Sequence, residues 1–261
     1  MEVVPVQSAH EIAVLAADAI EALVRSNPDS VLGLATGSTP LPVYRELITR
    51  HRNGSAPSYA RVHTFNLDEY VGLPEGHEQS YLATIRREFT DGIELDRARV
   101  HGPDPDPERL ASAGERYESE IRAAHGIDLQ ILGLGANGHL AFNEQGSSLA
   151  SLTRMKTLTQ RTRQDNARFF DSIDQVPKHV LTQGIGTISR ARHLVLLATG
   201  EAKADAVAAM IEGPVSASCP GSALQLHPHA TVLLDAPAAV KLERLDYYRE
   251  VYANKPAWQG L

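Results

Sequence analysis

The segment richest in chemically active side chains is residues 132–146, which reads LGLGANGHLAFNEQG. His139 brings an imidazole, the side-chain type suited to proton transfer near neutral pH. Glu144 is a carboxylate that can orient it, and the amide of Asn137 can hold an imidazole through a hydrogen bond. An imidazole held in this way can take a proton from one oxygen and return it to another. The spacing also fits a hairpin turn at Asn137-Gly138 with a solvated histidine.

Asp68 follows the apolar run RVHTFNL, where a predicted strand ends. A carboxylate at a strand tip can cap the next element, or it can act as a base that moves a proton between neighbouring carbons if water is excluded. Glu69 is expected to point away from Asp68 if the chain stays extended, because side chains alternate along a strand. Spacing alone leaves both roles of Asp68 open.

The loop Thr36-Gly37-Ser38-Thr39-Pro40 joins an apolar run to the helical stretch LPVYRELITRHR. Backbone N–H groups at a helix start, with the positive end of the helix dipole, suit a phosphate. The same residues fit a tight turn followed by an N-cap. The loop is neither a Walker loop nor GxGxxG, so it does not indicate a nucleotide.

Three cations are candidate anion contacts: Arg163, Arg168 and Lys203. Taken singly, each is typical of a solvated surface charge. Together with a phosphate loop, they would supply a bidentate arginine and a lysine point charge to one oxyanion. A chain with a net charge of −7 needs such locally placed cations to bind an anionic substrate.

Composition excludes several classes of protein. The negative net charge argues against a general nucleic-acid partner, and no apolar run approaches the ~20 residues that cross a bilayer. The N-terminal residues lack a basic leader and a small-residue cleavage site, so we expect them to belong to the fold. Cys219 is the only cysteine, which fits a reducing compartment and a cytoplasmic location. His139, Glu144 and Asp128 form no recognised ligand pattern, so no metal is expected.

The secondary-structure elements that must position these residues are predicted to follow a repeated order of strand, loop and helix. A capping box at Ser8 to Glu11 predicts a first helix that runs to about Arg25. Apolar runs then precede most of the polar motifs, and the run ATVLLD precedes a helix expected near Pro237. This alternation predicts one α/β domain with a mainly parallel sheet and helices on both faces. Ligands of such sheets bind beyond the carboxyl ends of the strands.

Six segments, in order from about residue 30 to 230, resemble the successive signatures of the glucosamine-6-phosphate deaminases (the glucosamine/galactosamine-6-phosphate isomerase family): ATGSTP, FNLDEYVGL, GLGANGHLAFNEQGSS, TRQDNARFF, VPKHVLTQGIGTI and SALQLHPHA. The resemblance implies a modified doubly wound, Rossmann-like sheet in a single domain over residues 1–261. It also implies a mobile lid at about residues 154–183, no cofactor, and conversion of glucosamine 6-phosphate and water to fructose 6-phosphate and ammonia.

The resemblance also implies a role for each matching position. Asp68 matches the base that moves a proton between C2 and C1, and His139 matches the base that opens the sugar ring, flanked by Asn137 and Glu144. Five further positions are implied to bind substrate, chiefly its phosphate: Gly37, Ser38, Thr39, Arg168 and Lys203.

Two positions depart from the family pattern. Position 137 is asparagine where many relatives have aspartate, and an amide cannot stabilise a protonated imidazole with a full charge. Ring opening is therefore expected to depend more on Glu144. Position 145 is glutamine where proline is usual, so we expect the loop that carries Glu144 to be less rigid.

Two other functions fit the same sequence. A 6-phosphogluconolactonase is similar in fold, but the FNLDEY and GHLAFNE segments and the lid with Arg168 favour the deaminase. A non-catalytic sugar-phosphate sensor would need a DNA-binding module, for which the residues before the first predicted strand supply only one helix.

A second anion site is expected around Ser147, Arg154 and Lys156. Arg154 and Lys156 lie two apart, on one face if this stretch is extended. The three residues resemble those that bind the activator N-acetylglucosamine 6-phosphate in allosteric family members. This implies a homo-oligomer with an effector site at a subunit contact.

Overall fold

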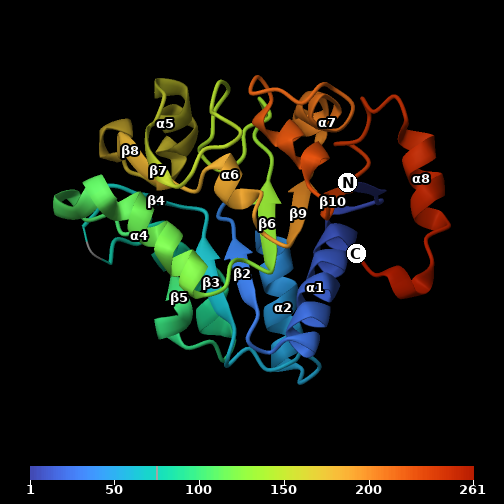
Figure 1. Cartoon of the computed structure of the whole chain (residues 1–261), viewed down its shortest axis with the longest axis horizontal. Helices are drawn as coiled ribbons and strands as arrows, with labels where there is room; N and C mark the ends of the chain where they lie inside the picture. Colours follow the sequence, from blue (N-terminus) through green and yellow to red (C-terminus); the bar gives the residue numbers. More distant parts are fainter. Residues whose placement is uncertain (75) are drawn as a thin grey trace.

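The computed structural model describes residues 1–74 and 76–261. In that part of the chain, seven strands form a parallel sheet in the order β1-β10-β9-β6-β2-β3-β5. Their bounds are β1 (Glu2–Pro5), β2 (Val31–Leu34), β3 (His63–Asn66), β5 (Val100–His101), β6 (Leu129–Gly133), β9 (His193–Ala198) and β10 (Ala230–Leu234). Figure 1 shows these strands running side by side through the centre of the molecule. The expected α/β class is confirmed.

Helices flank this sheet. Their bounds are α1 (Ala9–Ser26), α2 (Leu41–Arg52), α3 (Tyr81–Glu88), α4 (Leu110–Ala123), α5 (Gln160–Asn166), α6 (Ile185–Ile188), α7 (Ala204–Ile211) and α8 (Leu245–Ala253). Short 3-10 turns complete the connections: η1 (Thr90–Gly92), η2 (Arg97–Arg99), η3 (Pro107–Arg109), η4 (Ala167–Phe169), η5 (Ile173–Gln175), η6 (Glu201–Lys203), η7 (Pro220–Leu226) and η8 (Ala257–Gln259). Within the described residues, none of the helices combines the length and hydrophobicity needed to span a bilayer.

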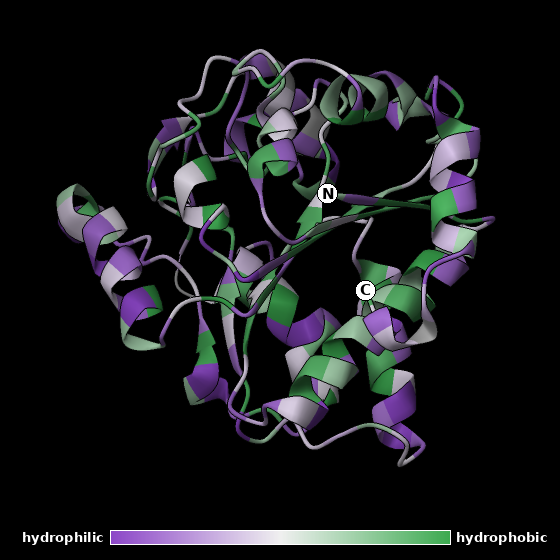
Figure 2. Ribbon diagram, turned by 45° about the vertical axis from the view of Figure 1, so that its right-hand side comes forward, coloured by the Kyte–Doolittle hydropathy of each residue, from purple (hydrophilic) through white to green (hydrophobic). Residues whose placement is uncertain are grey.

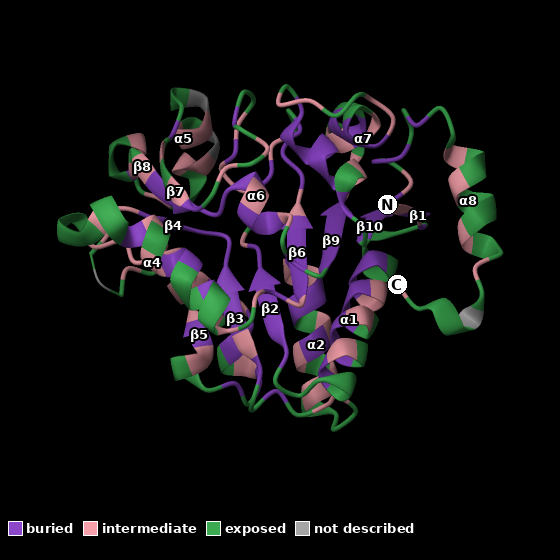
Figure 3. Cartoon of the chain, in the orientation of Figure 1, coloured by how far each residue is buried: buried purple, intermediate pink, exposed green. Residues whose placement is uncertain are grey.

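The central strands are covered on both faces. Every residue of β2, β9 and β10 is buried, although successive side chains point to opposite sides of a strand. These strands are purple along their length in Figure 3, and Figure 2 shows helices that carry both hydrophobic and hydrophilic bands. Near-continuous apolar strands of this kind are typical of a parallel sheet between helical layers.

The first helix forms as its capping box predicts. The hydroxyl of Ser8 accepts a hydrogen bond from the backbone N–H of Glu11 over 3.2 Å, and α1 ends at Ser26, one residue beyond the expected Arg25. Ile12, Ala16 and Ile20 are buried at helical spacing.

A second, antiparallel sheet was not expected. It has the order β4-β8-β7, with bounds β4 (Asp68–Tyr70), β7 (Arg154–Thr157) and β8 (His179–Thr182). The strands β7 and β8 delimit almost the whole of the segment expected as a lid, and α5, η4 and η5 lie between them. Figure 1 shows this unit at the upper left, beyond the carboxyl end of β3.

The prediction of a helix near Pro237 is wrong. Residues 236–241 form turns, and α8 begins only at Leu245. The carboxylate of Asp235 accepts the N–H of Ala238 over 2.9 Å, and Ala239 donates to the carbonyl of Asp235 over 3.2 Å. This single turn does not propagate, and Leu242 then enters the hydrophobic core.

Candidate active site

The His139 loop starts with the tight turn that its glycines allow. Gly138 donates to the carbonyl of Gly135 over 3.0 Å, and Gly135 donates to the carbonyl of His139 over 2.9 Å. The imidazole lies over Gly135, where a Cβ atom would come within 2.3 Å of its Cε1. The turn alternative is thus correct for the backbone, but the histidine is not a freely solvated side chain.

Three side chains of this loop form one hydrogen-bonded network. The Nδ2 amide of Asn137 donates to Oε2 of Glu144 over 2.8 Å, and Oδ1 of Asn137 lies 2.7 Å from Nδ1 of His139. Because Oδ1 can only accept, Nδ1 of His139 must carry a hydrogen, and a neutral ring then keeps a lone pair on Nε2. The network therefore prepares Nε2 to take up a proton.

Glu144 is held as a carboxylate. Its Oε2 is 3.5 Å from Nδ1 of His139, and the contact with His139 and the hydrogen bond from Asn137 lower the pKa of Glu144 to about 2. Asn137 is hydrogen-bonded to both Glu144 and His139. The negative charge of Glu144 therefore acts on the imidazole of His139 partly by polarising the Asn137 amide.

The departure at position 145 is accommodated by hydrogen bonds. The side chain of Gln145 donates to the carbonyl of Ser218 over 2.9 Å, and Gly146 donates to the carbonyl of Ala217 over 2.8 Å. Both bonds attach the end of the catalytic loop to the segment before η7. They constrain this loop at the position where the family resemblance implies a proline.

Asp68 is a buried carboxyl group at the start of β4, with 6% of its surface exposed. Burial, with a smaller contribution from the charge of Glu69, raises the pKa of Asp68 to about 8. Glu69 instead accepts the backbone N–H groups of Tyr81 and Leu82, each over 2.9 Å, at the start of α3. The expectation that Glu69 points elsewhere is confirmed, and Glu69 caps the start of α3 together with the N-cap residue Ser80.

The loop before α2 lines a cavity. Gly37 has a φ of +100°, a conformation that L side chains rarely adopt. Ser38 and Thr39 line a cavity of about 190 Å³ together with Thr199, which follows β9. Thr199 was not among the residues expected at the site. Its position at the carboxyl end of a predicted strand could have indicated it, because ligands of parallel sheets bind there.

The two remaining phosphate candidates do not line this cavity. Lys203 ends η6, and its partial burial lowers its pKa. Arg168 lies in η4, exposed, with its guanidinium 4.7 Å from the ring centroid of Phe169. The expected phosphate contacts therefore lie on three segments, and Ser38 and Thr39 are the ones among them that line the cavity beside α2.

Comparison with known proteins identifies the family. Residues 5–233 match the family model described as glucosamine-6-phosphate isomerases/6-phosphogluconolactonase. The chain belongs to this family.

Several family members are similar over their whole length. The glucosamine-6-phosphate deaminase of Pseudarthrobacter chlorophenolicus is 57% identical over 261 residues, which cover 100% of both chains. That of Streptomyces coelicolor is 55% identical over 262 residues, again with 100% of both chains covered.

Solved structures of the family share the fold. The structure of a monomeric glucosamine-6-phosphate deaminase superposes with a TM-score of 0.89 at 41% identity, over 92% of this chain and 100% of that one. A 6-phosphogluconolactonase from Trypanosoma cruzi gives a TM-score of 0.74 at 22% identity, over 93% of this chain and 97% of that one. At that identity the second likeness concerns the fold alone.

In this member of the family, the segment 154–183 contacts the loop that carries His139 and Glu144. The hydroxyl of Thr162, on α5, donates to Oε1 of Glu144 over 3.2 Å. Sequence analysis missed Thr162, because nothing in its local sequence indicates which distant carboxylate it contacts.

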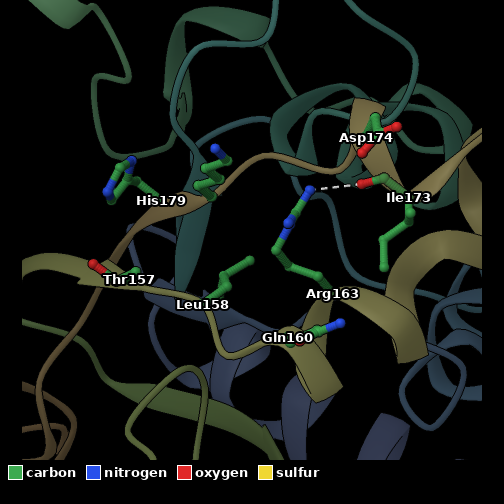
Figure 4. A pocket seen from close by; sticks show the side chains of 8 residues that line it. Thr157, Leu158, Gln160, Arg163, Ile173, Asp174 and His179 are labelled. Atoms are coloured by element: carbon green, nitrogen blue, oxygen red, sulfur yellow. Dashed lines mark hydrogen bonds between the residues drawn. The ribbon is translucent and has the colours of Figure 1, made fainter.

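Arg163 has a role within the lid itself. Its guanidinium donates to the carbonyls of Ile173 over 2.7 Å and Val176 over 3.2 Å. Figure 4 shows this side chain crossing a pocket of about 400 Å³. The residues lining that pocket are Thr157, Leu158, Gln160, Arg163, Ile173, Asp174, Lys178 and His179. Arg163 therefore ties α5 to the segment 173–176 and uses two of its five N–H donors to do so.

The residues expected to form an effector site lie on two segments. Arg154 and Lys156 alternate along β7, so they share one face of the strand. Ser147 is buried directly after the catalytic loop, and its backbone N–H donates to the carbonyl of Glu144 over 3.0 Å. Among the described residues, no group of three or more His, Cys, Asp or Glu side chains is arranged to hold a metal ion.

Proposed function

We propose that this chain is a glucosamine-6-phosphate deaminase, which converts glucosamine 6-phosphate and water to fructose 6-phosphate and ammonia. The proposal is supported by relatives of that name with identities of 54% to 58% over the full chain. The observation that carries it chemically is the presence of two acid–base groups: His139, whose Nδ1 is held by Asn137, and Asp68, whose pKa is raised by burial.

His139 opens the sugar ring. Its Nε2 takes the proton from the hydroxyl on C1 and gives it to the ring oxygen, so the C1–ring oxygen bond breaks and an aldehyde forms. Asn137 fixes the tautomer that this step needs, and Glu144 supplies negative charge near the imidazolium that forms in between.

Asp68 then isomerises the open chain. As a carboxylate it removes the proton from C2 and delivers it to C1, while a proton from the substrate's own ammonium group passes to the oxygen on C1. The amino aldehyde thus becomes an imine at C2 with a hydroxyl group on C1. Water adds to the imine, ammonia leaves, and the ketose phosphate remains. The raised pKa of Asp68 suits this step, because a base with a pKa near the working pH both takes up and returns a proton.

The phosphate end orients the substrate. Gly37, Ser38 and Thr39 offer backbone and hydroxyl donors at the start of α2, and Lys203 and Arg168 supply positive charge. Burial of Lys203 disfavours its charged form, so a phosphate beside it would offset that cost. Binding energy from this non-reacting end then holds C1 and C2 against Asp68.

The segment 154–183 acts as the lid of a single catalytic domain. Thr162 links α5 to Glu144, so closure over a bound sugar would exclude water and adjust the catalytic carboxylate in one movement. The reaction consumes only water and the sugar phosphate and needs no cofactor. These are small cytoplasmic metabolites, which with the single cysteine favours the cytoplasm.

The test is ammonia release from glucosamine 6-phosphate by the purified protein, measured beside hydrolysis of 6-phosphogluconolactone. A deaminase releases ammonia and leaves the lactone intact. Lactone hydrolysis without ammonia would instead assign the other activity in the family's description, and neither product would favour a sensor.

The proposal includes regulation by N-acetylglucosamine 6-phosphate at Ser147, Arg154 and Lys156, at a contact between subunits. Burial lowers the pKa of Arg154, so an anionic effector would stabilise its charge. Because β7 leads directly into the lid, effector binding would favour one lid position.

Substrate saturation with and without this effector, in wild type and Lys156→Ala, tests the regulation. Sigmoidal curves that the effector makes hyperbolic, with no response in the variant, are expected. Curves that are hyperbolic in wild type and unchanged by the effector would remove the regulatory site, and sedimentation analysis of the same samples would report the oligomeric state.

A further inference from the structure

The end of β8 lies between the two catalytic segments. On one side, Gln183 reaches the residues just before Asp68: its backbone N–H donates to the carbonyl of Leu67 over 2.7 Å, and its side-chain amide donates to the carbonyl of Asn66 over 3.0 Å. Thr182 is paired with Asp68 itself in the β4–β8 register.

On the other side, the same two residues reach the loop between His139 and Glu144. The side-chain amide of Asn143 donates to the carbonyl of Gln183 over 2.8 Å. The backbone N–H of Phe142 donates to the hydroxyl of Thr182 over 3.2 Å. Residues 182–183 thus make hydrogen bonds to both catalytic segments at once.

The two amides that make this connection are fully buried. Asn143 and Gln183 are each 0% exposed, and burying a primary amide is unfavourable unless it is hydrogen-bonded. Asn143 also donates to the carbonyl of Leu140 over 3.1 Å. The partners of both side chains are backbone carbonyl oxygens, which can only accept hydrogen bonds. The NH2 group of each amide, and not its oxygen, must therefore point towards these partners. An aliphatic side chain would fill the same volume without this cost, but it would remove one of the hydrogen bonds that connect the two segments.

We propose, building on the function proposed above, that Asn143 and Gln183 are positioning residues that hold the ring-opening loop at a fixed separation from Asp68. Neither residue needs to touch the substrate. Their effect is to keep C1 and C2 of the opened sugar within reach of Asp68 after His139 has acted, since small displacements of reacting groups cost large factors in rate.

The chain supplies a matched control for this proposal. Gln130, on β6, is also 0% exposed, and its side-chain amide also donates to one backbone carbonyl, that of Ile131, over 2.9 Å. Gln130→Met and Gln183→Met therefore remove the same kind of hydrogen bond from equally buried sites, but only the second removes a bond to the segment that precedes Asp68.

The experiment measures kcat and KM for glucosamine 6-phosphate, urea unfolding, and the fraction of a C2 deuterium that appears at C1 of the product. We expect Gln183→Met and Asn143→Leu to lower kcat by about tenfold or more with KM changed by less than about threefold, and to lower the transferred fraction. Gln130→Met should lose comparable stability while keeping kcat and the transferred fraction close to wild type.

Equal losses of kcat in Gln183→Met and Gln130→Met would overturn the proposal, as would an unchanged deuterium transfer in the slow variants. If Gln183→Met does not fold, Thr182→Val tests the same connection, because it removes only the hydroxyl that Phe142 binds. A wild-type protein that releases no ammonia would overturn the proposed function and this inference together, whereas an active wild type with unaffected variants overturns the inference alone.

Discussion

The hydroxyl of Thr162, in the lid segment, donates a hydrogen bond of 3.2 Å to Oε1 of Glu144, the carboxylate that faces the Asn137–His139 pair. The opposite oxygen, Oε2, accepts from Asn137. One carboxylate is thus shared between α5 and the Asn137–His139 pair, so the position of α5 and the orientation of Glu144 are linked.

Replacing Thr162 with valine tests this link. The change keeps the shape of the side chain and removes the donor, so we expect kcat/KM to fall about threefold to tenfold, which corresponds to about 0.5–1.5 kcal/mol. Thr162→Ser keeps the hydroxyl and should stay close to wild type. If serine and valine variants lose activity equally, the hydrogen bond has no role in the reaction.

The pH profile of kcat/KM reports the protonation of Asp68. Since Asp68 must be ionised to act as a base and its pKa is about 8, we expect kcat/KM to rise with pH up to about pH 8. Glu69→Gln removes a nearby negative charge, which should move this rise to lower pH by about half a unit or more. The substrate titrates identically in both experiments, so a rise at the same pH in both proteins would argue against Asp68 as the titrating base.

Asp68 is also expected to cost stability. Its pKa is about 8 in the folded protein against 3.8 for a free side chain, so the folded state holds this proton more tightly than the unfolded state does. The cost is therefore absent below about pH 4 and grows as the pH rises towards 8. Asp68→Asn lacks the titration, and we expect it to be more stable than wild type by about 1–3 kcal/mol at pH 8 and by much less at pH 5.

Urea unfolding at several pH values measures this difference. Asp246→Asn is the control, because Asp246 is fully exposed on α8. A stability difference between Asp68→Asn and wild type that does not change with pH would contradict the assigned pKa.

The phosphate contacts are tested by Arg168→Ala and Lys203→Ala. Each variant loses one cation, so KM for glucosamine 6-phosphate should rise about tenfold or more, while the weak binding of unphosphorylated glucosamine should hardly change. The ratio of the two affinities, measured by steady-state kinetics and calorimetry, is the informative quantity. Equal losses for both sugars would mean that these residues support the structure rather than the phosphate.

The parts of the fold that the sequence predicts are those with strong local signals. The apolar runs of β2, β9 and β10 are buried on both faces and need no distant partner to be recognised. The capping box of α1 is likewise complete within four residues. The loop before α2 and the glycine-rich turn before His139 follow from the same local rules.

The second sheet had no such signal. The strand β7 reads RMKT, with intermediate and exposed residues only, so its hydropathy resembles that of a loop. It becomes a strand because β8 pairs with it, and that pairing joins residues about 25 positions apart in the sequence. The prediction of a helix near Pro237 failed for the opposite reason. There the local sequence favours a helix start, but the burial of Leu242 ends it.

In the candidate site, too, some residues can be recognised from the local sequence and others only from the tertiary structure. Asp68, His139 and Glu144 are visible in the sequence because their types and spacing are informative. The contacts of Thr162 with Glu144, and of Gln183 with Asn66 and Asn143, join segments that only the tertiary fold brings together.

The most direct test of the account follows both products of the reaction in one assay. Wild type and Asp68→Asn are incubated with glucosamine 6-phosphate, and ammonia and fructose 6-phosphate are quantified over time. We expect wild type to form the two products in a one-to-one ratio. We expect Asp68→Asn to bind the sugar phosphate with little change while its kcat falls by about 100-fold or more, because an amide cannot accept the C2 proton. A variant that retains more than about a tenth of the wild-type kcat, or a wild type that forms neither product, would contradict the central claim.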